Sequence, residues 1–417
     1  MTTPDFDTTI PATASPEVEF VSQINWNTSR EIDTAPPARG LDRAYVREYA
    51  KALEEGDFDY TLVPYFSSSP ESFVLAAAIG AVTERIKPVV ALRPNHTFPL
   101  VAAQKLATLD QLTQGRAVLH LISGGNDAEQ RKQGDYEPKD RRYARTSEYI
   151  DLLRAAWTEK APFSHDGEFY RFDDFGPGFP TYSGEPIPIS IGGESDAAYD
   201  VGSSKADWFA FNSGASLAQT RLDFARVAQI ASAAGRPTPR FWVTFRPVVA
   251  STPEKAWETA HDYAAKLSLS SQAFAKAFGL DLTKADPATI TPEAVGQRRA
   301  REYAAASERV DRATWFGFTR ATGGFGAASA GLVGTPETVA AAIVDYIDAG
   351  ASVVSIKGYD TLNDVRTYGQ EVLPLVRQEL AHRKATGRRS DLQARHLGYA
   401  DPAVVFAADR AAQSVAV

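Results

Sequence analysis

The chain has 417 residues, of which 44% are hydrophobic and 23% are charged. This composition excludes global disorder, because enough apolar surface is present to offset the entropy lost on folding. The net charge of −8 argues against nucleic-acid binding, which needs an excess of Lys and Arg on one surface. The absence of cysteine excludes disulfides, thiolate metal sites and cysteine nucleophiles.

No apolar run reaches the roughly 18 residues of a membrane span. The N-terminus carries Asp5 and Asp7 and no basic start, so it does not resemble a signal peptide. We therefore expect a cytoplasmic protein that has neither a membrane nor a nucleic acid as its partner.

Short apolar runs alternate with helical patterns along most of the chain, which is typical of successive βα units. Eight runs have the continuous apolar character of strands buried on both faces: Val18–Asn25, Tyr60–Pro64, Lys87–Leu92, Ala117–Ser123, Ile187–Gly192, Trp208–Asn212, Val243–Ala250 and Ser352–Lys357. Helical periodicity follows in Ala44–Glu55, Glu71–Val82, Leu100–Thr113, Arg142–Trp157, Ala197–Ser204, Leu217–Ala234 and Val339–Ala349. The pattern predicts an α/β fold, a closed (β/α)8 TIM barrel.

The regular spacing breaks after the seventh strand, where about a hundred residues replace a short connection. Its glycine-rich segment Thr319–Gly331 favours a mobile lid over the barrel mouth, with a disordered insertion as the alternative. We therefore divide the chain into a flexible segment 1–17, a barrel 18–380 whose insertion 251–335 contains the lid, and a tail 381–417. The tail is either a solvated helix with a loose end or an arm on a neighbouring subunit.

Two segments could together bind a phosphate at the mouth, where barrel enzymes place their chemistry. Gly192–Asp196 joins a strand to a helix, so its backbone N–H groups and the Ser195 hydroxyl can converge on an anion, although a plain tight turn explains it equally well. Asp140–Tyr143 begins another helix with two cations and a phenol. Because no Gly-x-Gly-x-x-Gly follows an early strand, this pair favours a mononucleotide over a dinucleotide.

Further polar residues are expected at the strand ends. Asn95, His96 and Thr97 follow the third strand, and we interpret His96 as structural. His120 lies inside the fourth strand, as either a functional group or a hydrogen-bonded core residue. Lys357 closes the eighth strand.

Arg246 lies in the apolar seventh strand. A buried guanidinium requires an anionic or carbonyl partner, so it pairs with a core carboxylate or, as we favour, with an anionic substrate. No histidine or carboxylate spacing indicates a metal site, and no Gly-x-Ser-x-Gly elbow indicates a hydrolase.

Several motifs in consistent order resemble the bacterial luciferase-like, reduced-flavin-dependent monooxygenases, with alkanesulfonate monooxygenase as the nearest relative. The resemblance covers Val18 to Leu380. The residues that carry it are Val89–Pro94, Thr97, Ala102 and Ala103, Thr108–Asp110, Gly115–Ala117, Ser123 and Gly124, Arg142 and Tyr143, Gly192–Asp196, Leu332–Gly334, and Gly358 and Tyr359.

The resemblance implies a (β/α)8 barrel with a long mobile insertion, and it assigns roles to single residues. Tyr143 and Ser195 would hold the phosphate of FMN, and Thr97 would lie beside the isoalloxazine ring where oxygen binds. The cofactor-binding set is completed by Asn95, Gly193 and Glu194. Tyr359 would face the substrate, and Arg320 would be the lid arginine that closes over it.

The chain departs from alkanesulfonate monooxygenase at the predicted substrate end. Thr244 and Arg246 stand where those enzymes have Arg and His, Ser69 replaces a cysteine, Thr361 replaces a histidine, and His120 replaces an asparagine. We take Ser69, Arg246, Arg320, Tyr359 and Thr361 as the substrate-binding set. These departures favour a broader class of organosulfur substrates than alkanesulfonates.

The expected function is a two-component monooxygenase. Reduced FMN, supplied by an NAD(P)H-dependent flavin reductase, would react with molecular oxygen to give a peroxyflavin that oxygenates a small sulfonate- or sulfone-like substrate. Thr97, with His120 or Asn95, would stabilise the peroxide, while Arg246 and Tyr359 act on the substrate. The family resemblance also implies a homodimer or homotetramer. Two alternatives are a deazaflavin-dependent oxidoreductase and a non-catalytic flavin-binding protein.

Overall fold

The computed structural model describes residues 17–33, 35, 38, 40–123, 126–211, 214–277, 294–307, 309–323, 330–390 and 392, without the side chains of 271–277. Eight parallel strands close into a barrel, because β8 pairs with β9 and completes the ring. The strands are β1 (Glu19–Gln23), β2 (Tyr60–Val63), β3 (Lys87–Leu92), β4 (Val118–Leu121), β7 (Ile189–Gly192), β8 (Trp208–Phe211), β9 (Arg240–Val249) and β13 (Ala351–Ile356). The predicted (β/α)8 barrel and its eight strands are thus confirmed, with ends shifted by up to three residues.

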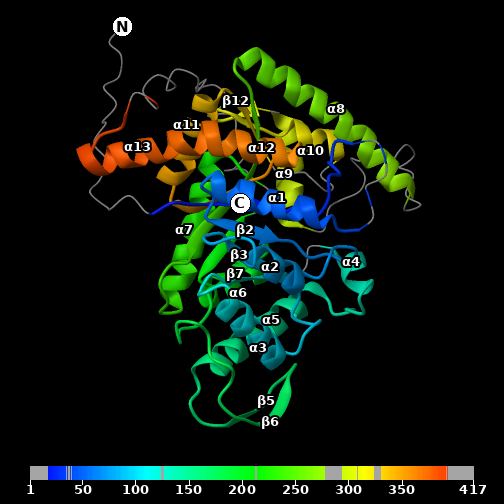
Figure 1. The fold of residues 1–417 in the computed structure, drawn as a ribbon, viewed down its shortest axis with the longest axis vertical. Coiled ribbons are helices and arrows are strands. Elements are labelled where there is room, and N and C mark those ends of the chain that lie inside the picture. The colour runs from blue at the N-terminus through cyan, green and yellow to red at the C-terminus, as the bar shows by residue number, and fades with distance from the viewer. Residues whose placement is uncertain are drawn as a thin grey trace.

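Helices surround this barrel, as Figure 1 shows. They are α1 (Arg43–Glu55), α2 (Ser72–Gly80), α3 (Pro99–Leu112), α4 (Asp127–Arg131), α5 (Lys139–Thr158), α6 (Asp196–Lys205), α7 (Leu217–Ala233), α11 (Pro336–Asp348), α12 (Thr361–Thr367) and α13 (Leu373–Thr386). A π-helical turn, Tyr368–Val372, joins the last two. Every residue of β13 and of β4 is buried, which explains why these strands have no polar alternation in the sequence.

The barrel interior is filled by side chains that alternate with the outward-facing ones. Val21, Val89, Trp208 and Trp242 belong to one buried cluster contributed by different strands. Below it, at the N-terminal ends of the strands, Glu19 accepts from Tyr60 Oη at 2.9 Å and pairs with Lys87 at 3.2 Å and with Arg240. These contacts link four strands at the N-terminal end, whereas barrel enzymes place their functional loops at the C-terminal end.

The predicted insertion lies between β9 and α11. It contains α8 (Pro253–Ala277), α9 (Val295–Ala306), β10 (Arg309–Val310), β11 (Thr314–Trp315), α10 (Gly317–Thr322) and β12 (Gly331–Gly334). β9 continues beyond the barrel and pairs there with β12, beginning at Arg246 opposite Gly331. α8 runs along the upper edge of the molecule in Figure 1. Residues 278–293 and 324–329 lie outside the described residues, and the second range contains six of the thirteen residues of the predicted glycine-rich segment.

The expected boundaries of the two terminal segments stay predictions. α13 runs on to Thr386, past the predicted boundary at residue 380, while residues 1–16 and 393–417 lie outside the described part of the chain. An unpredicted hairpin, β5 (Phe163–Asp166) and β6 (Arg171–Phe175), projects at the lower end of Figure 1. None of the helices in the described ranges has both the length and the apolar content needed to cross a membrane.

Candidate functional site

The turn between β7 and α6, Gly192–Ser195, requires a glycine at its second position. Gly193 has φ +144°, and a Cβ added to it would lie 2.4 Å from the Tyr143 hydroxyl and 2.7 Å from the Ala198 Cβ. An L side chain therefore meets both backbone strain and a steric clash here. The absence of a side chain lets the Tyr143 hydroxyl of α5 lie directly against this turn.

Two hydroxyls meet at this turn. Tyr143 is buried and donates to the Gly192 carbonyl oxygen at 3.2 Å. Burial raises the pKa of Tyr143 to about 12, although the nearby Ser195 side chain acts to lower it. Ser195 is the N-cap of the ten-residue α6, yet its Oγ makes no capping bond and is a buried atom without a hydrogen-bond partner. An unsatisfied buried hydroxyl at the positive end of a helix dipole is well suited to an anionic ligand.

The insertion reaches this turn through an ion pair. Arg299 of α9 pairs with Glu194 Oε2 at 3.2 Å and with Asp223 Oδ2 of α7 at 2.7 Å. The Glu194 side chain is only 8% exposed, so the pair is shielded from bulk water. Glu194, predicted as a cofactor residue, is thus turned toward α9 and α7, and it fixes the turn against the insertion.

The loop between β3 and α3 contributes further unsatisfied polar atoms. Asn95 Oδ1 and both ring nitrogens of His96 are buried atoms without hydrogen-bond partners among the described residues. Burial, helped by the charge of Arg93, lowers the pKa of His96 to about 4, so this ring is neutral at pH 7. Tyr149 of α5 donates to the Thr97 carbonyl at 3.0 Å, so the helix that carries Tyr143 also holds this loop.

His120 lies in the barrel interior at the level of the mouth. Its Nδ1 lies 3.0 Å from Ser190 Oγ on β7, and its ring lies 5.4 Å from that of Trp242. Burial lowers the pKa of His120 to about 4. Trp242 Nε1 and Thr244 Oγ1 are buried nearby along β9 without partners. The histidine is therefore a neutral, hydrogen-bonded interior residue in a region that still has free polar atoms.

A second group, which we call the mouth cluster, consists of three charged residues, Glu31, Arg246 and Lys357, together with Tyr359. Arg246 pairs with Glu31 Oε2 at 3.1 Å, lies over the Tyr359 ring at 4.9 Å and donates to the Gly358 carbonyl at 3.5 Å. Lys357 Nζ lies 2.8 Å from Glu31 Oε1. Burial opposes the ionisation of Glu31, but the two cations lower its pKa to about 2. The sequence predicted either a protein carboxylate or an anionic substrate as the partner of Arg246. The structure provides a carboxylate, Glu31, from the loop after β1.

The other predicted substrate residues make local contacts. Tyr359 is fully buried, and its ring lies 4.7 Å from that of Phe318. Thr361 Oγ1 lies 2.9 Å from the Tyr45 hydroxyl of α1. The Ser69 hydroxyl donates to the Phe66 and Pro70 carbonyls within its own turn, at 3.0 Å each.

Arg320 of α10 is exposed and donates through Nε to the Ala304 carbonyl of α9 at 3.2 Å. This contact holds two helices of the insertion together. The roles of Ser69, Arg320 and Thr361 toward a substrate therefore remain predictions.

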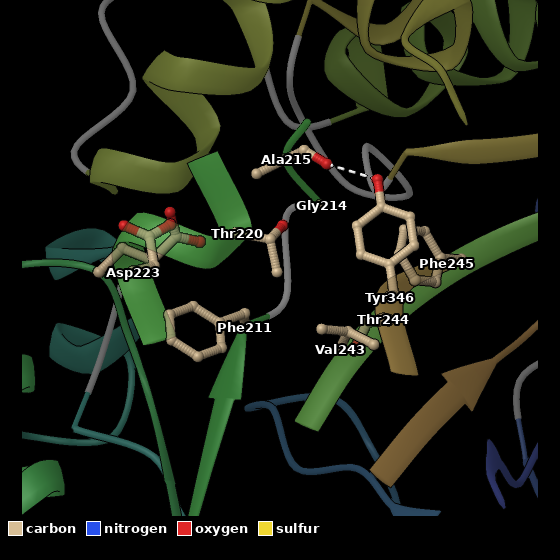
Figure 2. Close-up of a pocket in the computed structure, with 10 residues that line it drawn as sticks. Phe211, Gly214, Ala215, Thr220, Asp223, Val243, Thr244, Phe245 and Tyr346 are labelled. Atoms are coloured by element: carbon tan, nitrogen blue, oxygen red, sulfur yellow. Dashed lines mark hydrogen bonds between the residues drawn. The ribbon is translucent and has the colours of Figure 1, made fainter. Parts of the chain in front are cut away.

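A small cavity lies among residues that follow β7 and β8 and residues of β9 (Figure 2). Its lining combines the end of β8 and the middle of β9 with the first turns of α7 and with Tyr346, whose hydroxyl donates to the Ala215 carbonyl at 2.7 Å. Its volume of about 10 Å³ holds roughly one water molecule. The cavity lies between Thr244 and Asp223 and is too small for a substrate.

Sequence reasoning missed two residues of these sites, Glu31 and Arg299. Glu31 lies in the loop after the first strand, a position where functional residues are expected in a barrel, so its place gave a usable signal. Arg299 lies in the insertion, far from Glu194 in the sequence, and no local pattern points to it. Among the described residues, no group of three or more His, Asp or Glu side chains is arranged to hold a metal ion.

Comparison with known proteins identifies the family. Residues 22–352, well over half of the chain, match the family model described as luciferase-like monooxygenase. The chain belongs to the luciferase-like monooxygenase family. The expected family and the expected class of enzyme, a flavin-dependent monooxygenase, are thereby confirmed. The closer resemblance to alkanesulfonate monooxygenase remains a prediction.

Solved structures of similar proteins agree with the luciferase-like fold. EDTA monooxygenase from Chelativorans sp. BNC1 has 19% sequence identity and a TM-score of 0.69, over 88% of this chain and 98% of its own. A riboflavin lyase solved with modified FMN and riboflavin has 19% identity and a TM-score of 0.70, over 92% and 96%. The coenzyme F420-dependent tetrahydromethanopterin reductase of Methanopyrus kandleri has 18% identity and a TM-score of 0.60, over 86% and 99%. At these identities the likeness establishes the fold alone.

Proposed function

We propose that this protein is the oxygenase of a two-component system that uses reduced FMN and molecular oxygen to oxygenate a small organosulfur substrate. A separate NAD(P)H-dependent flavin reductase would supply the reduced flavin. When bound, reduced FMN supplies the electrons that activate oxygen. The observation that carries the proposal is the unsatisfied Ser195 hydroxyl beside the Tyr143 hydroxyl and Gly193, at the start of α6.

The residues present fit the phosphate of a mononucleotide. Ser195 Oγ and the first backbone N–H groups of α6 can donate to phosphate oxygens, and the bare Gly193 allows the close approach. Tyr143 keeps its proton, because its pKa lies near 12, and so it can serve as a further donor. The ion pair between Glu194 and Arg299 keeps the turn in place for this contact.

The remaining residues would handle the reacting end. The neutral His120, and Asn95 and Thr97 from the β3–α3 loop, would donate to or accept from groups above the barrel interior. The buried aromatic lining around Trp242 excludes water from that region. Arg246 and Tyr359 lie at the mouth, where a substrate would enter.

Flavin binding tests the proposal before any substrate is known. Purified protein is titrated with FMN, with reduced FMN without oxygen, and with a reduced deazaflavin, followed by fluorescence. Loss of a hydrogen bond to a charged group costs about 1.5–3 kcal/mol, so Ser195→Ala should weaken FMN binding roughly tenfold or more. Ser204→Ala is the matched control, because that hydroxyl bonds within the same helix, to the Asp200 carbonyl, and should leave binding unchanged.

Turnover then separates the candidate functions. With a flavin reductase present, oxygen uptake should depend on a sulfonate or sulfone and should release the oxygenated product. Tight deazaflavin binding without FMN binding would contradict the proposal in favour of the deazaflavin-dependent alternative, which similar folds such as the F420-dependent reductase motivate. Flavin binding with oxygen uptake independent of every substrate would instead support a flavin-binding protein.

A further inference from the structure

The mouth cluster holds two buried cations against one carboxylate. Arg246 and Lys357 are 9% and 8% exposed; Arg246 lies in β9 directly after its last pairing with β13, and Lys357 directly follows β13. Glu31 contacts both of them, Lys357 through Oε1 and Arg246 through both of its oxygens. A third titratable group near Arg246, Asp364, has its pKa raised by burial to about 7 and so supplies only part of a negative charge. The cations therefore form a site for one monoanion, in which the Glu31 carboxylate lies.

Glu31 is less enclosed by the protein than the two cations with which it pairs. Its side chain as a whole is 32% exposed, although Oε2 itself is buried against the cations, whereas Arg246 and Lys357 are buried residues. Its backbone is fixed by two other contacts: the Glu31 carbonyl accepts from Ser270 Oγ of α8 at 3.0 Å, and the neighbouring Ile32 packs in the cluster that contains Tyr359. A rotation of the Glu31 side chain toward solvent would therefore free the cations without moving the loop.

We propose that Glu31 occupies an anion site formed by Arg246 and Lys357, and that a substrate carrying a carboxylate or sulfonate group binds there by displacing it. Two buried cations without an anion are costly, so the exchange requires an anionic ligand. Neutral substrates cannot make this exchange, so within the proposed organosulfur class the anion site favours sulfonates over sulfones, and Glu31 determines specificity by competing with the substrate's charged group. The proposal rests on the proposed function only in taking the barrel mouth as the substrate site.

Protonation does not open this site in the neutral range, because the pKa of Glu31 lies near 2. Displacement by a competing anion is then the remaining route. The loop offers a matched control residue: Asp33, two positions away, pairs with Arg30 at 2.9 Å rather than with the mouth cluster.

The test uses the full chain without flavin and measures the dissociation constant of methanesulfonate by calorimetry. Dimethyl sulfone, which is similar in size but neutral, is the control ligand. Removing an adjacent like charge changes an anion's affinity by about tenfold or more, so Glu31→Gln should tighten methanesulfonate binding by at least that factor. Asp33→Asn should bind methanesulfonate with the affinity of the wild type. The double variant Glu31→Gln with Lys357→Gln should not show the tighter binding of Glu31→Gln. Equal affinity of the wild type and Glu31→Gln would overturn the proposal.

If Glu31→Gln does not fold, the wild type provides the decisive measurement. Calorimetry on the wild type should detect binding of methanesulfonate but not of dimethyl sulfone, and absence of methanesulfonate binding would overturn the proposal. Ser195→Ala should leave methanesulfonate binding unchanged. If the protein does not bind FMN but Glu31→Gln still binds methanesulfonate more tightly than the wild type, only the proposed function is contradicted.

Discussion

Gly193→Ala tests whether the turn before α6 depends on the close approach of Tyr143. The added Cβ would meet the Tyr143 hydroxyl at 2.4 Å and the Ala198 Cβ at 2.7 Å, with φ at +144°. Strain at a positive φ costs about 1–3 kcal/mol, and overpacking adds about 1–3 kcal/mol. The free energy of unfolding should therefore fall by about 2–6 kcal/mol, or the turn should shift and lose its contact with Tyr143.

Gly235→Ala is the matched control, because Gly235 also has a positive φ, +65°, but a Cβ there would meet nothing within 4 Å. Gly235→Ala should lower the free energy of unfolding only by the backbone strain, about 1–2 kcal/mol. Thermal unfolding and FMN titration are measured on both variants. Gly193→Ala should lower the unfolding midpoint more and should alone weaken FMN binding, because only this turn carries Ser195.

Adding Tyr143→Phe to Gly193→Ala removes the oxygen that the new Cβ would meet. The double variant should regain part of the lost stability while binding FMN no better. The reasoning fails if Gly193→Ala is as stable as Gly235→Ala, or if the double variant is less stable than Gly193→Ala.

Three further predictions concern other contacts of the site. Burial lowers the pKa of His120 to about 4, below its value of about 6.5 in the unfolded chain, so its neutral form contributes stability that is complete above pH 6.5 and is lost toward pH 4. The free energy of unfolding, measured in urea, should shift in favour of His120→Asn over the wild type by up to roughly 3 kcal/mol between pH 7 and pH 4. A difference between the two proteins that does not change with pH would contradict this. Arg299→Ala leaves Glu194 buried without its cation and should weaken FMN binding several-fold in a fluorescence titration, whereas unchanged binding would show that α9 does not fix the turn. Thr361→Val and Tyr45→Phe each remove one partner of a buried hydrogen bond and should each cost about 1 kcal/mol; a double-mutant cycle should find them coupled, and additive costs would argue against this contact.

The turn proposed to bind the flavin phosphate was predicted from residues that are close in the sequence. Gly193, Glu194 and Ser195 follow a strand and open a helix, so their turn is a local feature that spacing and residue type reveal. Tyr143 was a candidate because it opens a helix beside two cations, and the family resemblance then assigned it to the phosphate of FMN. Its contact with Gly193 depends on how α5 packs against the β7–α6 turn, and no local pattern specifies that packing.

The substrate end was predicted only in part. The sequence shows that a buried Arg246 needs an anionic or carbonyl partner, but it leaves open whether a protein carboxylate or a ligand provides it. In the structure the partner is Glu31, which lies 215 residues away in the chain. Charge pairing across such a separation depends on which loops meet above the barrel.

The eight-stranded barrel could be predicted from the sequence alone, and the place of the functional loops at its C-terminal end stays a prediction. Continuous apolar runs can be buried only when both faces of a strand are covered, and a ring of parallel strands with outer helices achieves this. Only the tertiary structure decided the partners of the charged residues: Arg299 with Glu194, and Glu31 with Arg246 and Lys357. Strand formation depends on local hydrophobicity, whereas ion pairs form between side chains that folding brings together from distant segments.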